Sequence, residues 1–137
     1  MKTSSTVQQK PKRTLILAIV AGAFISVNVW ATVAIYRDST VQPYIWGSGA
    51  AAKSAKARDK AFADCMANGG TNCTIYDSNQ GAPGWAAVAH DSAFGTTVAT
   101  YGKQTKKEAK HVAKHLCKLS GGQNCKIVTT VYDRNGK

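Results

Sequence analysis

The sequence predicts a small disulfide-stapled α+β domain with an internal pseudo-twofold repeat, preceded by one N-terminal transmembrane helix. The nonapeptide CMANGGTNC at 65–73 returns as CKLSGGQNC at 117–125, with the same cysteine spacing and the same Gly-Gly pair. Each copy follows a helical pattern and precedes a β-branched stretch. A charge-free apolar run lies near the N-terminus. We therefore expect a small antiparallel sheet with two helices on one face.

The second copy, 105–133, shows the parts of each repeat most clearly. Thr105 and Glu108 form a capping box, which satisfies free amides at a helix start. Apolar residues follow at i, i+3, i+4 and i+7 spacing, namely Ala109, Val112, Ala113 and Leu116. Gly121 and Gly122 end the helix, because glycine tolerates the left-handed conformation of a helix C-terminus. A strand follows, and the first copy, 53–77, has the same order.

Three further stretches complete the predicted sheet. Residues 85–91 and 93–102 are expected to form two strands, joined by a turn near Asp91. The segment YIWGSG, residues 44–49, is a shortened counterpart of SAFGTT in the second copy. Each repeat therefore contains one or two strands, a helix, the cysteine loop and a closing strand.

The four cysteines indicate an oxidising compartment. An even count at regular spacing is typical of disulfides in small exported domains. Pairing within each copy, Cys65 with Cys73 and Cys117 with Cys125, would join a helix end to the next strand. A link between the two copies is the alternative pairing. Free buried thiols or a zinc site are weaker alternatives, because zinc ligands usually come in closer pairs.

The apolar run at 14–36 is predicted to span a membrane. Its 23 uncharged residues give roughly 34 Å of helix, enough for a hydrocarbon core of about 30 Å. Four basic residues precede it within 1–13, so this tail should be cytoplasmic and the rest exported. Ser26, Asn28 and Thr32 are the polar residues expected to contact a neighbouring helix. A linker at 37–45 then leads to the exported domain, 46–137.

A cleaved signal peptide is the alternative interpretation of this run. The basic start, the apolar stretch and Val29-Trp30-Ala31 as a cleavage site are all present. The apolar run continues beyond that site through TVAIY, which favours a retained anchor. Both interpretations place the domain outside the cytoplasm.

The charge of the chain points to anionic partners. The formal net charge is +11, and one predicted helix carries a row of lysines away from its apolar stripe. This predicted binding face consists of Lys106, Lys107, Lys110, Lys114 and Lys118. Anionic lipid, an anionic glycan or an acidic protein surface would suit it. Nucleic acid is not expected, because the domain is exported and the face lacks aromatics for base stacking. A merely solvated face is the plain alternative.

No constellation of residues predicts catalysis, a metal site or a cofactor. His111 and His115 have the one-turn spacing of a metal pair, but the glutamate of the H-E-x-x-H motif is missing and lysines flank them. His90 beside Asp91 has the composition of an oriented base, yet no free cysteine accompanies it and Ser92 lies in the turn. We therefore expect a protein that is not an enzyme.

The repeated pattern resembles a known family. Trp85-Ala86-Ala87-Val88-Ala89, then Phe94-Gly95, then alanines and cysteines at A-x3-A-x3-C spacing, is similar to domain of unknown function 4189. The resemblance extends from Trp46 to about Tyr132. It implies an exported, disulfide-bearing α+β domain of bacteria, with no established activity. Family members often carry further cysteines where this chain has Pro83-Gly84 and Tyr132, so bridges at those positions are absent.

Together these observations favour a non-catalytic accessory subunit. It would be anchored in the bacterial inner membrane, with a cytoplasmic N-terminus and a periplasmic domain. That domain would dock on a larger membrane complex of respiratory, photosynthetic or secretion type, or on an anionic envelope surface. A free-standing periplasmic binding protein of immunity or inhibitor type is the alternative, and an envelope enzyme is less favoured.

Overall fold

The structure, a computed structural model, describes residues 32–134 and contains two copies of a β-β-α-β unit. The first copy contains β1 (Thr32–Asp38), β2 (Ile45–Ala51), α2 (Ser54–Ala67) and β3 (Thr74–Gln80). The second contains β4 (Gly84–Asp91), β5 (Thr96–Lys103), α3 (Lys106–Leu119) and β6 (Lys126–Asp133).

Each copy forms its own three-stranded antiparallel sheet. The strand orders are β2-β1-β3 and β5-β4-β6, so the first strand of each copy is central. In the first sheet Ala34 lies opposite Gly49 of β2 and Ser78 of β3. The internal repeat predicted from the nonapeptides is therefore confirmed, and it includes every element of both copies.

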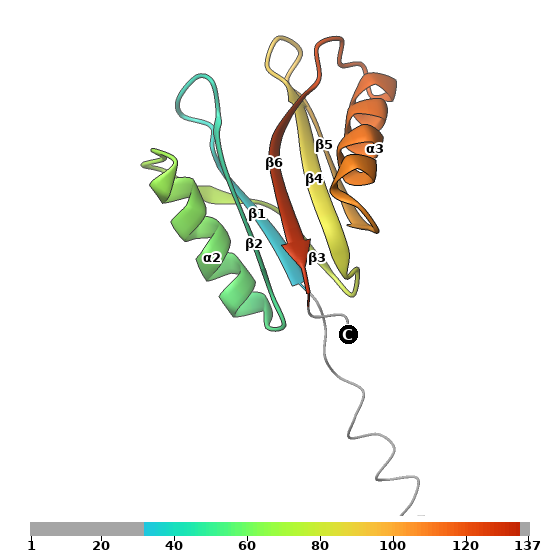
Figure 1. The fold of residues 1–137 in the computed structure, drawn as a ribbon. Coiled ribbons are helices and arrows are strands. Elements are labelled where there is room, and N and C mark those ends of the chain that lie inside the picture. Colours follow the sequence, from blue (N-terminus) through green and yellow to red (C-terminus); the bar gives the residue numbers. More distant parts are fainter. Residues whose placement is uncertain (1–31, 135–137) are drawn as a thin grey trace, which may run out of the picture.

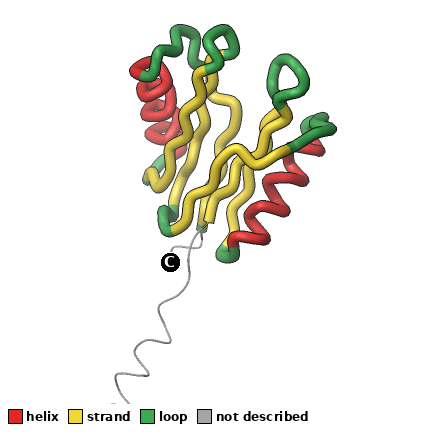
Figure 2. The backbone as a smooth tube through the Cα atoms, turned by 180° about the vertical axis from the view of Figure 1, so that it is seen from behind, coloured by secondary structure: helices red, strands yellow, loops and turns green. Residues whose placement is uncertain are grey.

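The two sheets pack face to face, with one helix on each outer side of the sandwich (Figure 1). Figure 2 shows the same arrangement from behind, with all strands between the two helices. The prediction of one sheet with two helices on one face was therefore wrong. The periodicity of each helix indicates that the helix packs on a sheet. It does not indicate whether the two helices pack on the same sheet or on two different sheets.

Alternate residues of the central strands supply the three layers of the core, as the two-residue period of a strand requires. Val33 and Ile35 of β1 pack between the sheets with Val88 of β4. Ala34 lies on the opposite side of β1, against α2. Ala87 of β4 takes the corresponding place beneath α3. Because the residues on the sheet faces covered by the helices are small, both helices lie close to their sheets.

Gly47 and Gly49 of β2 show how close that approach is. A methyl group added at Gly47 would lie 2.2 Å from the backbone nitrogen of Cys65. One added at Gly49 would lie 2.6 Å from the carbonyl oxygen of Ala57. The glycines before the first helix are therefore a packing surface for α2.

The position of β1 corrects the predicted boundaries of the membrane segment. Residues 32–36, the end of the expected span at 14–36, form a strand that pairs with β2 and β3. Thr32 is buried and lies opposite Ala51 and Gln80, so it is not a contact between membrane helices. The expected linker at 37–45 contains the end of β1, a loop and the first residue of β2.

The rest of the predicted span lies outside the described residues, as do Ser26 and Asn28. Within 32–134, neither helix has the length and apolar character needed to cross a membrane.

The sequence signals of the second helix are largely confirmed. The backbone nitrogen of Glu108 donates to Thr105 Oγ1 at 3.0 Å, as a capping box requires. The buried stripe of α3 is Ala109, Ala113 and Cys117, however, and Leu116 is 38% exposed. Only small side chains fit under a helix this close to its sheet. The buried stripe is therefore limited to these small residues, four positions apart, and Leu116 lies outside it.

Both predicted disulfides are present, Cys65–Cys73 and Cys117–Cys125. The two glycines of each nonapeptide have different roles. Gly121 has a φ of +104°, the left-handed conformation that ends α3. Gly122 leaves room for the disulfide, because a Cβ there would lie 2.5 Å from Cys125 Sγ. Gly69 and Gly70 repeat both features in the first copy. The disulfides indicate an extracytoplasmic domain.

Candidate functional site

Two buried aspartates hold the cysteine loops and are repeat counterparts. Asp91 Oδ2 accepts from the backbone nitrogens of Gln123 and Asn124, both at 2.7 Å. Asp38 Oδ2 accepts from the nitrogens of Thr71 and Asn72 at 2.9 Å. The sequence indicated Asp91 only as a neighbour of His90 near a turn, and Asp38 was assigned to the linker at 37–45.

Hydrogen bonding lowers the pKa of both carboxyl groups. For Asp38 the hydroxyl of Thr40 is the main cause, followed by backbone amides. For Asp91 the backbone amide of Asn124 is the main cause. Both side chains therefore remain charged at neutral pH and stabilise the loop conformation.

His90 and Asp91 are neighbours in sequence but do not act together. Asp91 turns toward the cysteine loop, while His90 points between the sheets, where Nδ1 lies 2.8 Å from Thr97 Oγ1. Consecutive side chains of a strand face opposite ways, which explains the separation. The geometry does not support an Asp–His pair.

The five predicted lysines all lie exposed on α3. At about 100° per residue, Lys110, Lys114 and Lys118 form a row along one side of the helix, next to the buried stripe. Lys106 lies over the ring of Trp85, with Nζ 5.4 Å from the ring centroid. Among residues 32–134, none of the five ammonium groups is paired with a carboxylate.

His111 and His115 lie on the outermost side of α3. Their rings are stacked with centroids 6.5 Å apart. Within the described part of the chain, no three histidine, cysteine, aspartate or glutamate side chains gather in a way that could hold a metal ion.

An aromatic cluster between the two sheets was not predicted from sequence. The Tyr44 and His90 rings are stacked at 5.1 Å, and Trp46 lies 5.6 Å from His90 and 5.4 Å from Tyr76. The guanidinium of Arg37 lies 4.9 Å from the Tyr76 ring centroid and also faces the Tyr44 and Trp46 rings. Only the packing of the sheets brings these residues together, so spacing in the sequence gives no signal for them.

A pocket of about 290 Å³ opens beside this cluster, between the two copies. We call it the inter-sheet pocket. Its lining consists of Pro43, Tyr44, Trp46, His90, Ser92, Asn124, Lys126 and Val128. Trp46 and His90 are only 5% and 6% exposed, and neither Trp46 Nε1 nor His90 Nε2 has a hydrogen-bond partner in the described chain. Burial lowers the pKa of His90, so the ring is neutral at pH 7.

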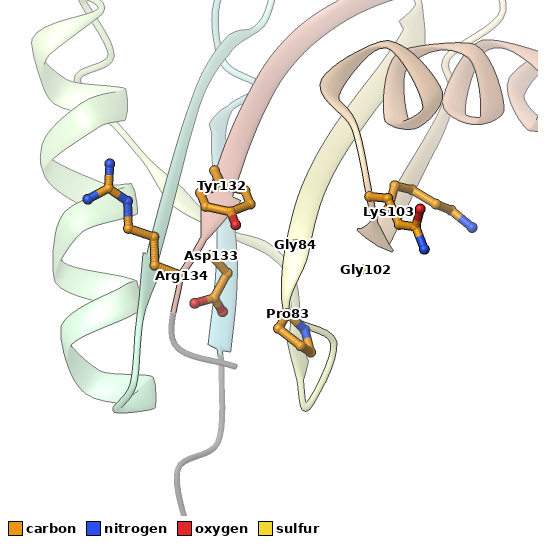
Figure 3. Close-up of a pocket in the computed structure, with 8 residues that line it drawn as sticks. Pro83, Gly84, Gly102, Lys103, Tyr132, Asp133 and Arg134 are labelled. Atoms are coloured by element: carbon orange, nitrogen blue, oxygen red, sulfur yellow. The ribbon is translucent and has the colours of Figure 1, made fainter. Parts of the chain in front are cut away.

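A second pocket of about 310 Å³ lies at the other end of the sandwich, near the end of β6. Its lining includes Gly84, Lys103, Tyr132 and Arg134. Figure 3 shows the side chains of Lys103 and Arg134 pointing away from each other on opposite sides of the opening. The two cations therefore do not converge on one ligand position.

Comparison with known proteins identifies one half of this fold. Residues 85–136 match the family model described as domain of unknown function (DUF4189). The match begins in β4, so it is shorter than the expected resemblance from Trp46 onward. No curated protein and no solved structure matches the chain. Residues 85–136 are thus a DUF4189 domain, and residues 32–80 repeat its β-β-α-β fold and its disulfide.

Proposed function

We propose that this protein is a non-catalytic, extracytoplasmic accessory subunit that docks through α3 on an acidic surface of a larger membrane complex. The observation that carries the proposal is the exposed set of five lysines on α3, none of them paired with a carboxylate within residues 32–134. Unpaired cations on one helix face favour an anionic partner and accelerate its encounter.

The acidic residues of the domain do little to offset these lysines. The whole chain has seven acidic residues, and three of them, Asp38, Asp91 and Asp133, are buried. Asp64 accepts from the Ser48 nitrogen, and Glu108 accepts from the Gln104 nitrogen at the start of α3. The surface is therefore more basic than the composition alone indicates.

The two copies differ at two of the three positions that form the lysine row, while Lys110 corresponds to the basic Arg58. Counting from the paired cysteines, Lys114 and Lys118 of α3 correspond to Phe62 and Met66 of α2. Phe62 is 44% exposed and Met66 is 43% exposed. The fold does not require lysine there, because the same fold in the first copy is built with apolar residues. This difference supports a role for the lysines outside folding.

The position of β1 bears on whether the protein is anchored or free. Once Thr32–Asp38 is counted as a strand, the apolar run retains 14–31, which is 18 residues or roughly 27 Å of helix. That length is at the lower limit for a span, and the small-residue site ending at Ala31 directly precedes β1. These two points favour signal-peptide cleavage over a retained anchor, and docking through α3 does not require the anchor.

A charge reversal on α3 tests the docking proposal. The variant Lys107→Glu, Lys110→Glu, Lys114→Glu, Lys118→Glu leaves the buried stripe untouched. Exposed substitutions usually cost within about 0.5 kcal/mol each, so the fold should persist, as circular dichroism can verify. We expect the variant to lose its co-purifying partner. Wild-type association should weaken with salt, since charges are screened within about 8 Å at physiological ionic strength.

A matched control has the same change of charge on the other helix. In it, four exposed cations of the first copy are replaced by glutamate, namely Lys53, Lys56, Arg58 and Lys60. We expect this control to keep the partner. If the α3 variant folds and still co-purifies at low salt, the lysines are only a solvated face. Binding to vesicles with anionic lipid, with no co-purifying protein, would assign the face to the membrane surface instead.

A further inference from the structure

The large apolar side chains that remain exposed in this fold gather in two places. Among residues 32–134, eight such side chains are at least 38% exposed, and six of them lie beside one helix or the other. We call these two groups the α2 patch and the α3 patch. The α2 patch consists of Phe62, Met66 and Ile75, and the α3 patch consists of Leu116, Leu119 and Phe94.

The α2 patch lies on the β3 side of the first sheet. One side of α2 faces β2, since Asp64 Oδ2 accepts from the backbone nitrogen of Ser48. Phe62 lies on the other side of the helix, where its ring centroid is 5.9 Å from that of Tyr36 in β1. Tyr36 pairs with Ile75 of β3. The patch therefore extends from α2 to the edge strand β3.

The α3 patch lies on the β5 side of the second sheet. Counting from the paired cysteines, Leu116 of α3 corresponds to Asp64 of α2, and β5 corresponds to β2. Leu116 is therefore on the β5 side of the helix, and the lysine row is on the β6 side. Cys117 Sγ lies 4.0 Å from the carbonyl oxygen of Thr96, so this end of α3 lies beside the turn that contains Phe94.

Both patches share one flank of the sandwich. β3 lies opposite β5, because the hydroxyl of Tyr101 in β5 donates to Asp77 of β3 at 2.7 Å. β2 lies opposite β6, because the hydroxyls of Ser48 and Thr129 are 2.7 Å apart. β3 and β5 are edge strands, so their outer edges lie between the two patches. We call this surface the β3–β5 flank, and the lysine row lies on the opposite flank.

We propose that the β3–β5 flank binds the same flank of a second copy of this chain, so that the protein is a symmetric dimer. The dimer does not depend on the docking function of α3, because the lysine row lies on the opposite flank and stays exposed. Each dimer presents two lysine rows, and two rows that bind one acidic partner add avidity.

The apolar area of the flank is sufficient for a dimer. The six side chains are between 38% and 70% exposed, which gives about 600 Å² of apolar surface at roughly 200 Å² for a whole large side chain. A stable interface buries about 800 Å² of each partner, of which about 60% is apolar. Exposed apolar surface of several hundred Å² marks an interaction site on a soluble protein.

The distribution of charge favours a second copy as the occupant. Among the described helix residues, those next to the opposite flank include Lys60, Lys107 and the lysine row, whereas those next to the β3–β5 flank include one cation, Arg58. Two copies that meet through their β3–β5 flanks hold these lysines at least about 20 Å apart, because a three-stranded sheet is roughly 10 Å wide. Salt screens charges beyond about 8 Å. Contact between two lysine flanks would be repulsive, and a membrane attracted by the lysines would face the other flank.

Sedimentation equilibrium measures the mass of the protein purified from the cell envelope with both disulfides intact. Interfaces of this size have dissociation constants of about 1 μM or below, so the wild type should have the mass of two chains at about 50 μM. A wild type that is monomeric at this concentration overturns the proposal. If that monomer binds vesicles of neutral lipid, the flank is a membrane-binding surface instead.

The double variant Phe62→Lys, Met66→Lys gives the α2 patch the residues of the second copy. Because α3 carries Lys114 and Lys118 at these positions, the fold should persist, as thermal unfolding can verify. We expect the dissociation constant of the dimer to rise at least about 100-fold, because the lysines would be buried in the interface without partners.

The double variant Leu116→Asp, Leu119→Ala makes the same exchange in the α3 patch, since α2 carries Asp64 and Ala67 at these positions. It should also dissociate the dimer, because a carboxylate would replace an apolar contact in the interface. If one of the two flank variants does not fold, the other decides.

The control has the same change of charge as the α2 variant but lies outside the flank. It is Val41→Lys, Tyr132→Lys, at the two remaining exposed apolar side chains. This control should remain dimeric, and so should the variant with four glutamates on α3, so dimerisation and docking are tested separately. A folded flank variant that remains dimeric, or a control that dissociates to the same extent, overturns the proposal.

Discussion

At the scale of single residues, the two buried aspartates show what a repeated sequence preserves. Asp38 and Asp91 lie 53 positions apart, and each bonds two successive amides of its cysteine loop. The asparagine common to both nonapeptides contributes its backbone amide to this contact. The sequence revealed the asparagine but not its partner, because the partner comes from a strand more than thirty residues earlier.

Asp91→Asn should lower the melting temperature by several degrees at pH 7, because an amide nitrogen would face the loop amides. The pKa of Asp91 is lowered in the folded protein, so its stabilisation is complete above the ordinary value of 3.8 and is lost as the pH falls below it. The wild type should therefore lose stability as the pH falls below 3.8, and Asp91→Asn should lose less. Thermal unfolding followed by circular dichroism measures both. Asp59→Asn, at an exposed position of α2, should behave as the wild type does; a variant Asp91→Asn with an unchanged pH dependence would contradict this role.

At the scale of elements, the second copy was predictable strand by strand and the first was not. α3 and β6 lie where the capping box and β-branched content placed them, and β4 and β5 overlap the strands expected at 85–91 and 93–102, although β5 begins only at Thr96. β1 was missed because Thr32–Tyr36 continues an apolar run, and a fully buried strand has no polar alternation to distinguish it from a membrane helix. The sequence did contain one signal for β1, which is its similarity to β4. Both strands end in a basic residue and an aspartate, and a serine follows each of them.

The contact between α2 and β2 gives a prediction at this scale. Gly47→Ala should destabilise the protein by about 3 kcal/mol, because the new methyl group meets the α2 backbone, which cannot yield locally. Gly95→Ala is the comparison, since its methyl group meets nothing within 4 Å and only its φ of +68° is unfavourable, at about 1 kcal/mol. Urea unfolding measures both values. Equal costs would mean that α2 moves freely on its sheet.

At the scale of the whole molecule, the sequence could establish the repeat and the disulfides but not the way in which the halves meet. Val33, Ile35 and Val88 pack between the sheets, yet their pattern is equally consistent with strands of one sheet. The inter-sheet pocket follows from that packing, so Trp46 and His90 could not be recognised as neighbours beforehand. Features formed within one copy, such as the disulfides, could be predicted from the sequence, whereas contacts between the two copies could not.

The start of the folded domain leads to the last prediction, which concerns processing. Thr32 is buried and paired on both sides, so cleavage after Ala31 would leave β1 complete. We expect N-terminal sequencing of the exported protein to begin at Thr32. Ala31→Glu should block cleavage, because the peptidase needs a small residue before the cut, and it should leave the protein in the membrane fraction. Lys2→Gln, far from the site, should be processed as the wild type is. An exported wild-type protein that retains residues 14–31 and resists extraction from the membrane would show instead that the apolar run is a retained anchor.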